Sequence, residues 1–269
     1  MTKRVRLRKR ISVNDIEDEV SGQVTKCKWT PLQWRTQLNN IRKMRESRDA
    51  PVDLMGCEKL ADETEHPKTF RLQVLISLML SSQTKDQVTA AAMERLKSKG
   101  CTLAMLTDMK TEDLEELIYP VGFYKTKALN IKKTCEIIKQ KYDSDIPKTV
   151  KELCTLPGVG PKMAYLAMKC AWKKVTGIGV DTHVHRITNR LKWSKRPTKT
   201  PEETRMALEE WLPREYWDEI NLLLVGFGQQ ICRPVNPNCM GCLNRSICPS
   251  ASKLTLKNYK KKQLSEDDH

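Results

Sequence analysis

One lysine and one aspartate in this chain occupy positions that suit covalent chemistry. Lys162 ends the stretch LPGVGPK, and Asp181 follows nineteen residues later in VDTHVHR. Pro161 is typical of the first helical position, so Lys162 would stand in the first turn of a helix. The positive end of the helix dipole disfavours a second positive charge there and favours a neutral, nucleophilic amine. A close Asp181 would favour the ammonium instead, and the sequence does not decide between the two effects.

Asp181 has two interpretations. It precedes a new helical pattern and has the position of an N-cap, a role that contributes about 1 kcal/mol. A carboxylate at a cap is also ionised and oriented at the mouth of a helix, where it can act on a neighbouring group. The residue alone does not decide between them.

The turn before Lys162 has the features of a backbone anion site. Gly158 and Gly160 permit positive φ and remove Cβ atoms that would block a ligand. Successive N–H groups around Val159, next to a helix N-terminus, can bind a phosphate without reading a base. An ordinary turn between two helices is the alternative, because many such turns carry glycine.

Four cysteines near the C-terminus form the other chemical cluster, with the spacing Cys232-x6-Cys239-x2-Cys242-x5-Cys248. Structural zinc sites usually use two short Cys pairs, and only one is present here. A single uneven run better suits one iron–sulfur cubane, so we favour iron–sulfur over zinc. His183 and His185 are two residues apart and would point to different helix faces, which argues against a metal pair. We expect His183 to support the site and His185 to pack.

The elements that must position these residues are helical almost throughout. Apolar residues recur at helical spacing, and strand-like alternation is nearly absent, so the sequence predicts an all-α protein. We expect one helix over 33–45 and two helices joined around 81–85. Two more are broken at 120–122, with a capped start at Thr111, and a helix–hairpin–helix surrounds the glycine turn.

Composition limits the function. The chain of 269 residues has 48 Lys and Arg against 33 Asp and Glu, a net charge of +15 that fits a polyanionic partner such as nucleic acid. The longest apolar run, 74–80, is too short to cross a bilayer, and the N-terminus lacks a signal-peptide core. Ten cysteines without a secretory signal argue against a disulfide scaffold.

Taken together, these motifs resemble the endonuclease III family of DNA glycosylases, of the eukaryotic type. The resemblance covers roughly residues 30–250 and rests on LPGVGPKMA, VDTHVHRITNRL, MLSSQTKD and the four-cysteine run. It implies two all-α domains on either side of a DNA-binding cleft. It implies a basic disordered tail over 1–28 and a six-helix domain with the helix–hairpin–helix over 65–174. Residues 29–64 plus 175–250 would form a helical domain with the iron–sulfur cluster, and 251–269 a polar C-terminal tail.

The resemblance also implies residue roles. Lys162 would be the nucleophile and Asp181 the carboxylate facing it, in a bifunctional glycosylase and lyase acting on oxidised pyrimidines in duplex DNA. The four cysteines would hold one 4Fe–4S cluster. Gln83 would fill the gap left by the flipped nucleotide, and Phe123 matches a wedge position, with core packing as its alternative.

The resemblance assigns phosphate contacts to Lys125 and Lys127 and implies a monomer that works with downstream repair proteins. The basic N-terminal residues predict the nucleus as the location, with the mitochondrion as a further one. A monofunctional adenine glycosylase is the nearest alternative, although such enzymes lack a lysine at the position of Lys162. A noncatalytic DNA-binding protein with a structural metal would need neither Lys162 nor Asp181.

Overall fold

The computed structural model describes residues 29–252, and within that range every regular element is a helix. The predicted all-α class is therefore confirmed for the described residues. Both tails, 1–28 and most of 251–269, lie outside them. The helices are α1 (Trp34–Met44), α2 (Pro51–Met55), η2 (Cys57–Lys59), α3 (Pro67–Ser81), α4 (Asp86–Ser98), α5 (Leu103–Asp108), α6 (Thr111–Ile118), α7 (Tyr124–Lys141), α8 (Val150–Leu153), α9 (Pro161–Cys170), α10 (Thr182–Leu191), α11 (Pro201–Trp211), η3 (Arg214–Tyr216) and α12 (Trp217–Gln230).

Most predicted helix ends agree with the structure. Helix α1 fills the predicted 33–45 segment, α3 and α4 are separated by residues 82–85, and α6 and α7 by 119–123. The predicted cap at Thr111 is wrong, because Thr111 is the first residue of α6 and Lys110 is the N-cap, without a side-chain hydrogen bond. Residues 65–174 contain seven helices rather than six, and α8 has only four residues.

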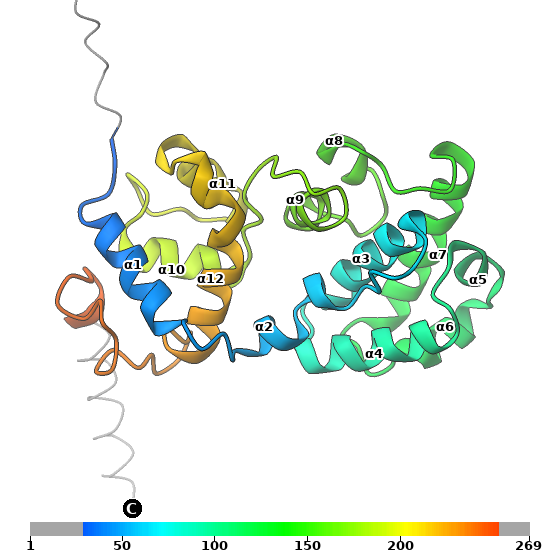
Figure 1. Ribbon diagram of the computed structural model, residues 1–269, viewed down its shortest axis with the longest axis horizontal. Coiled ribbons are helices and arrows are strands. Elements are labelled where there is room, and N and C mark those ends of the chain that lie inside the picture. The colour runs from blue at the N-terminus through cyan, green and yellow to red at the C-terminus, as the bar shows by residue number, and fades with distance from the viewer. Residues whose placement is uncertain (1–28, 253–269) are drawn as a thin grey trace, which may run out of the picture.

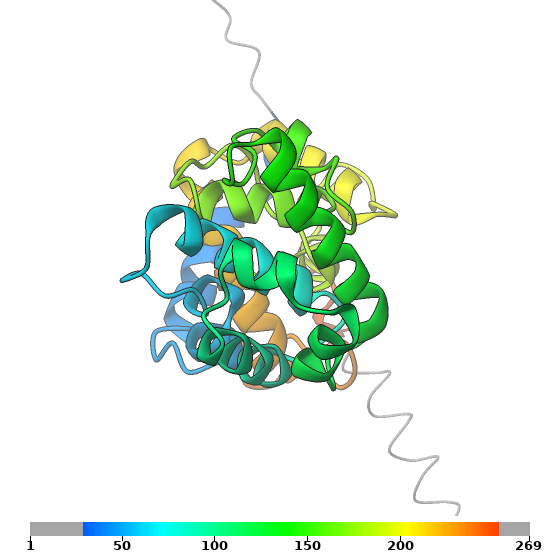
Figure 2. The same cartoon turned by 90° about the vertical axis from the view of Figure 1, so that its right-hand side faces the viewer.

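The buried apolar side chains form two separate clusters, the first core and the second core. The first core is built by α3 to α9, and the second by α1 together with α10, α11 and α12. Figure 1 shows these two groups of helices side by side, with α2 between them. In Figure 2 the helices of the first core are nearest the viewer. The second core therefore joins segments that lie far apart in the sequence.

The chain passes between the cores twice. In α2, Val52 packs on the second core whereas Met55 packs on the first. After α9 the chain leaves the first core at Trp172 and enters the second at Ile178. The expected boundary at 64/65 therefore differs from the packing, which changes core inside α2, because Met55, Cys57 and Leu60 already pack on the first core.

None of the helices in residues 29–252 has the length and apolar character that a membrane span requires.

Candidate active site

A cavity of about 1100 Å³ opens between the two cores. Its wall combines the starts of α4, α9 and α10 with parts of α2 and α12. The polar and charged residues on this wall include Lys162, Asp181, Asp86, Gln83, Lys85, His183, Gln229 and Arg233. The cavity therefore brings Lys162 and Asp181, from different helices, into one space.

Lys162 stands where the sequence placed it. Gly160 is the N-cap of α9, Pro161 is its first residue and Lys162 its second. The Lys162 side chain is half-buried in the cavity wall. Lys162 is therefore accessible to a ligand in the cavity.

Asp181 is the N-cap of α10, and its Oδ1 accepts a hydrogen bond of 2.8 Å from the Val184 N–H. The cap interpretation is confirmed. Because the same carboxylate also lines the cavity, the cap does not exclude a chemical role. The hydrogen bond fixes the carboxylate in one orientation at the start of the helix.

His183, the second residue of α10, also lines the cavity. Burial lowers its pKa, the Asp181 charge opposes that shift and the Arg186 charge adds to it. Its Nδ1 lies 3.2 Å from Nη2 of Arg186. His185 lies away from this group, with Nδ1 2.6 Å from the Thr204 hydroxyl. The separation of the two imidazoles agrees with the argument against a metal pair.

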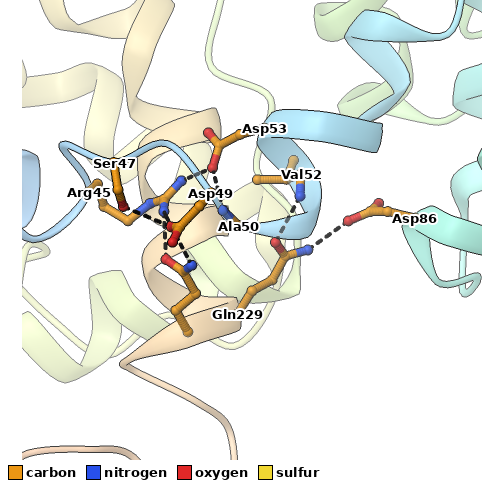
Figure 3. A network of polar contacts seen from close by, with 9 residues as sticks. Arg45, Ser47, Asp49, Ala50, Val52, Asp53, Asp86 and Gln229 are labelled. Atoms are coloured by element: carbon orange, nitrogen blue, oxygen red, sulfur yellow. Dashed lines mark hydrogen bonds and ion pairs between the residues drawn. The ribbon is translucent and has the colours of Figure 1, made fainter.

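Asp86 is a third charged residue of the cavity, and the sequence reasoning did not single it out. Burial raises the pKa of its carboxyl group, and a hydrogen bond from Gln229 and the charge of Lys162 oppose that rise. Gln229 Nε2 donates to Asp86 Oδ2 at 2.7 Å while Gln229 Oε1 accepts from the Val52 N–H at 3.1 Å (Figure 3). The only sequence signal was its place at the end of MLSSQTKD, and Gln229 had none.

The glycine turn agrees with its prediction only in part. Gly158 has φ +78°, and a Cβ there would lie 2.7 Å from the Asn130 amide, so glycine is required. Gly160 has an ordinary negative φ of −101° and lines the cavity. Val159 is 6% exposed, and its N–H donates to the Leu156 carbonyl. Its N–H and side chain therefore do not fit the predicted phosphate contact.

Gln83 and Phe123 both occupy left-handed backbone conformations, with φ of 51° and 58°. Gln83 is exposed and lines the cavity. Phe123, which immediately precedes α7, is 65% exposed, so the core-packing alternative is wrong. Phe123 is not among the residues that line the cavity.

The two lysines of the YKTKA stretch differ. Lys125 is exposed, as a phosphate contact requires. Lys127 is 8% exposed, and its Nζ donates to the Leu80 and Ser82 carbonyls and the Thr84 hydroxyl. The phosphate contact expected of Lys127 does not fit the structure, because its ammonium group already has three partners inside the protein.

The four cysteines line a second, small cavity beside the second core. Burial raises the pKa of Cys239, Cys242 and Cys248, and the charges of neighbouring cysteines in the cluster add to the rise. Arg190 donates to Cys232 Sγ at 3.3 Å. In residues 29–252, no three His, Cys, Asp or Glu side chains meet in metal-binding geometry. The fold therefore brings the four thiols together at one cavity.

Comparison with known proteins agrees with this architecture. Residues 76–214 match the family described as HhH-GPD superfamily base excision DNA repair protein. The Endonuclease III-like protein 1 of Gallus gallus is 62% identical, over 84% of this chain and 80% of the relative. The Endonuclease III homolog of Schizosaccharomyces pombe is 46% identical, over 88% and 70%.

Two solved structures have the same fold. A trapped endonuclease III–DNA covalent intermediate has a TM-score of 0.70 at 30% identity and covers 82% of this chain and 96% of its own. A non-covalent endonuclease III–DNA complex has a TM-score of 0.69 at 32% identity, with the same coverage. On the matched family, the identities and these folds, the chain belongs to the HhH-GPD superfamily of base excision DNA repair proteins and, within it, to the endonuclease III family.

Proposed function

We propose that the protein is a bifunctional DNA glycosylase and lyase that excises oxidised pyrimidines from duplex DNA. One observation carries the proposal: Lys162 and Asp181 stand at the starts of two different helices and line one cavity. That cavity is large enough for an extruded nucleotide, which must leave the base stack before its C1′ can be attacked. The similarity to endonuclease III–DNA complexes supports DNA as the partner.

The chemistry follows from an amine and a carboxylate at one sugar. The neutral Lys162 amine forms a bond to C1′, the C1′–N bond to the base breaks, and the base leaves with the electron pair and takes up a proton. Asp181 stabilises the positive charge that develops on the sugar. The lone pair on Nζ then forms a double bond to C1′, and O4′ leaves with the electrons of the C1′–O4′ bond and takes up a proton. The product is a Schiff base between Nζ and C1′.

The lyase step uses the same Schiff base. Loss of a proton from C2′ places an electron pair next to C3′, and the C3′–O bond breaks with departure of the phosphate. The strand is cut 3′ to the lesion by β-elimination. Water then hydrolyses the Schiff base and returns the free lysine.

Borohydride trapping on a duplex with one thymine glycol tests this proposal. Borohydride reduces the Schiff base to a stable amine, so the wild-type protein should become covalently attached to DNA. Lys162→Gln should give no adduct. Lys85→Gln is the matched control, because Lys85 lines the same cavity at the start of α4, and it should retain the adduct.

Other results would contradict the assignment in distinct ways. Base release without an adduct in the wild type would indicate a monofunctional glycosylase. An adduct that is lost with Lys85→Gln and kept with Lys162→Gln would move the nucleophile to Lys85. Lesion binding without base release or adduct would favour a noncatalytic DNA-binding protein.

We also propose that Cys232, Cys239, Cys242 and Cys248 hold one 4Fe–4S cluster. Support comes from an all-sulfur donor set around one cavity and from a basic partner, Arg190, on Cys232 Sγ. Such a cluster supplies a rigid anchor for the loop between α12 and the C-terminal residues. Brown protein with about four irons per chain is the expected result; colourless protein with stoichiometric zinc would refute it.

The arrangement around the cavity supports a further proposal about DNA binding. The two cores would act as two domains whose cleft receives DNA, with Gly158, Gly160 and Lys125 near phosphates. Binding to undamaged duplex should therefore weaken steeply with salt, and a flat salt response would contradict it.

We also propose that the protein is a monomer that passes its product to downstream repair proteins; sedimentation would measure its oligomeric state. We propose that it acts in the nucleus and also in the mitochondrion, and imaging of a tagged chain would test this location.

A further inference from the structure

Two exposed residues beside the large cavity have conformations that their local sequence does not favour. Gln83, between α3 and α4, and Phe123, just before α7, both have positive φ. Non-glycine residues rarely adopt this conformation, and it persists only where the surrounding structure enforces it. Something in the fold must therefore hold both residues in place.

The two segments are in direct contact. The Gly122 N–H donates to Thr84 Oγ1 at 3.2 Å. A Cβ on Gly122 would lie 2.7 Å from the Gln83 carbonyl oxygen, so the close approach requires glycine at this position. Residues 80–84 and 121–123 therefore form one unit, which we call the paired loops.

Lys127 bonds to both of the paired loops. Its backbone N–H donates to the Phe123 carbonyl at 3.0 Å. Its Nζ reaches back to the other segment and donates to Leu80 O at 2.6 Å, Ser82 O at 2.5 Å and Thr84 Oγ1 at 3.1 Å. These three oxygens belong to residues that precede and follow Gln83 in the sequence. A single ammonium group therefore fixes the chain on both sides of Gln83.

From these contacts we infer that Lys127 is a positioning residue that holds Gln83 and Phe123 ready to enter the DNA where a nucleotide is extruded. The inference rests on the proposed function, because it needs DNA with an extruded nucleotide at the cavity. It replaces the phosphate contact that the sequence suggested for this lysine. Lys127 acts through the paired loops and does not itself touch DNA.

The charge state of Lys127 suits this role. Burial lowers the pKa of Lys127 to about 8, so the group is mostly an ammonium near neutral pH. An ammonium has three N–H donors, and the paired loops provide three acceptors. Methionine, which is similar in length but has no donor, would leave the Leu80 and Ser82 carbonyl oxygens without this partner.

Helix α7 contains a matched control. Lys132 donates through Nζ to the carbonyls of Leu106, Thr107 and Met109, at 3.0, 2.5 and 2.5 Å. It has the same chemistry on the same helix but holds the end of α5, which does not line the cavity. Lys132→Met therefore imitates the structural damage of Lys127→Met without touching the paired loops.

The experiment compares binding to a duplex with one tetrahydrofuran abasic analogue and to the same undamaged duplex. Lys127→Met should reduce the affinity ratio of the two duplexes by about tenfold, as misplacement of a contacting group does. Lys132→Met should leave the ratio unchanged. A 2-aminopurine opposite the analogue should brighten less with Lys127→Met, because the stack is then opened less completely. An unchanged ratio with Lys127→Met, or an equal fall with Lys132→Met, would overturn the inference.

A double-mutant cycle with Gln83→Ala separates this inference from the proposed function. If Lys127 acts through Gln83, the two substitutions together should lower the ratio by little more than either alone. Fully additive effects would overturn the inference while leaving the proposed function intact. If wild-type protein itself does not prefer the abasic duplex, the proposed function fails, and the inference fails with it.

Discussion

The two passages of the chain between the cores use different interactions. The first, residues 45–56, is tied by buried polar groups. Arg45 is fully buried and pairs with Asp53 (Figure 3). It also donates to Gln230 Oε1 at 2.6 Å. The second, residues 172–180, relies on close backbone approach. Asn221 Nδ2 donates to the Gly179 carbonyl at 2.5 Å, and a Cβ on Gly179 would lie 2.9 Å from Leu166.

This difference assigns different tasks to the two passages. The second leads from α9 directly to α10 and therefore sets the position of Asp181 relative to Lys162. The first connects α1 and α2 to α12, and through Gln229 to Asp86 on α4. We expect changes in the second passage and at its end to affect the chemistry, and changes in the first to affect stability.

Asp181, where the second passage ends, should show the largest effect. Asp181→Asn should reduce single-turnover base release by about 10³-fold, because the charge facing the sugar is lost. Its free energy of unfolding should change by less than about 0.5 kcal/mol, since Asn is about as good an N-cap as Asp. Asp181→Ala should lose the same activity and also about 1 kcal/mol of stability. If Asp181→Asn kept its activity, the only role left for Asp181 would be that of the N-cap of α10.

Arg45 tests the first passage. Arg45→Met should lower the free energy of unfolding by about 3 kcal/mol, because it leaves the Asp53 carboxylate buried without its partner. Base release per folded molecule should stay near the wild-type rate. Denaturant titration and single-turnover kinetics measure the two quantities. The exposed Arg48 provides the control, and Arg48→Met should change stability by less than about 0.5 kcal/mol.

Gly179 tests the second passage away from the charged groups. The new Cβ of Gly179→Ala would meet Leu166 Cγ and Cδ2 at 2.9 Å and Lys162 O at 3.5 Å. We expect α9 to shift and base release to fall by roughly 10- to 100-fold. Adding Leu166→Ala should restore part of the rate although it lowers stability, because it makes room for the methyl group. A double variant slower than Gly179→Ala would contradict this view.

Asp86 should show the smallest effect, and one of opposite sign. Because burial raises its pKa in the folded state, its ionisation at neutral pH opposes folding. That cost is absent at low pH and develops as the pH rises through the folded-state pKa. Asp86→Asn should therefore raise the Tm slightly at pH 7.5, and the difference should disappear towards pH 4. Asp108→Asn, on the exposed end of α5, serves as the control and should lack that trend.

Local sequence rules anticipated the parts of the site that depend on local structure. The N-cap at Asp181 and the place of Lys162 in the first turn of α9 follow from patterns a few residues long. The positive φ of Gly158 also matched its prediction. Each of these features depends on the backbone within about one helical turn, so a short stretch of sequence is enough to predict it.

Contacts between distant segments were not predictable in the same way. Lys127 meets carbonyls more than 40 residues earlier, and Gln229 meets Asp86 at a separation of 143 residues. When only the neighbouring residues in the sequence are considered, a lysine beside an exposed loop is expected to contact a phosphate. The packing of α7 against α3 instead directs this lysine inward, and helical periodicity does not encode that choice.

The division of the second core between two distant segments has a consequence for synthesis on the ribosome. The first core is nearly continuous in sequence, whereas α1 finds its partners only after α12 has been made. At about 5–20 residues per second, α1 waits roughly 10 to 40 seconds with Trp34, Leu38 and Ile41 uncovered. In that interval the nascent chain carries an apolar helix face that a chaperone can bind.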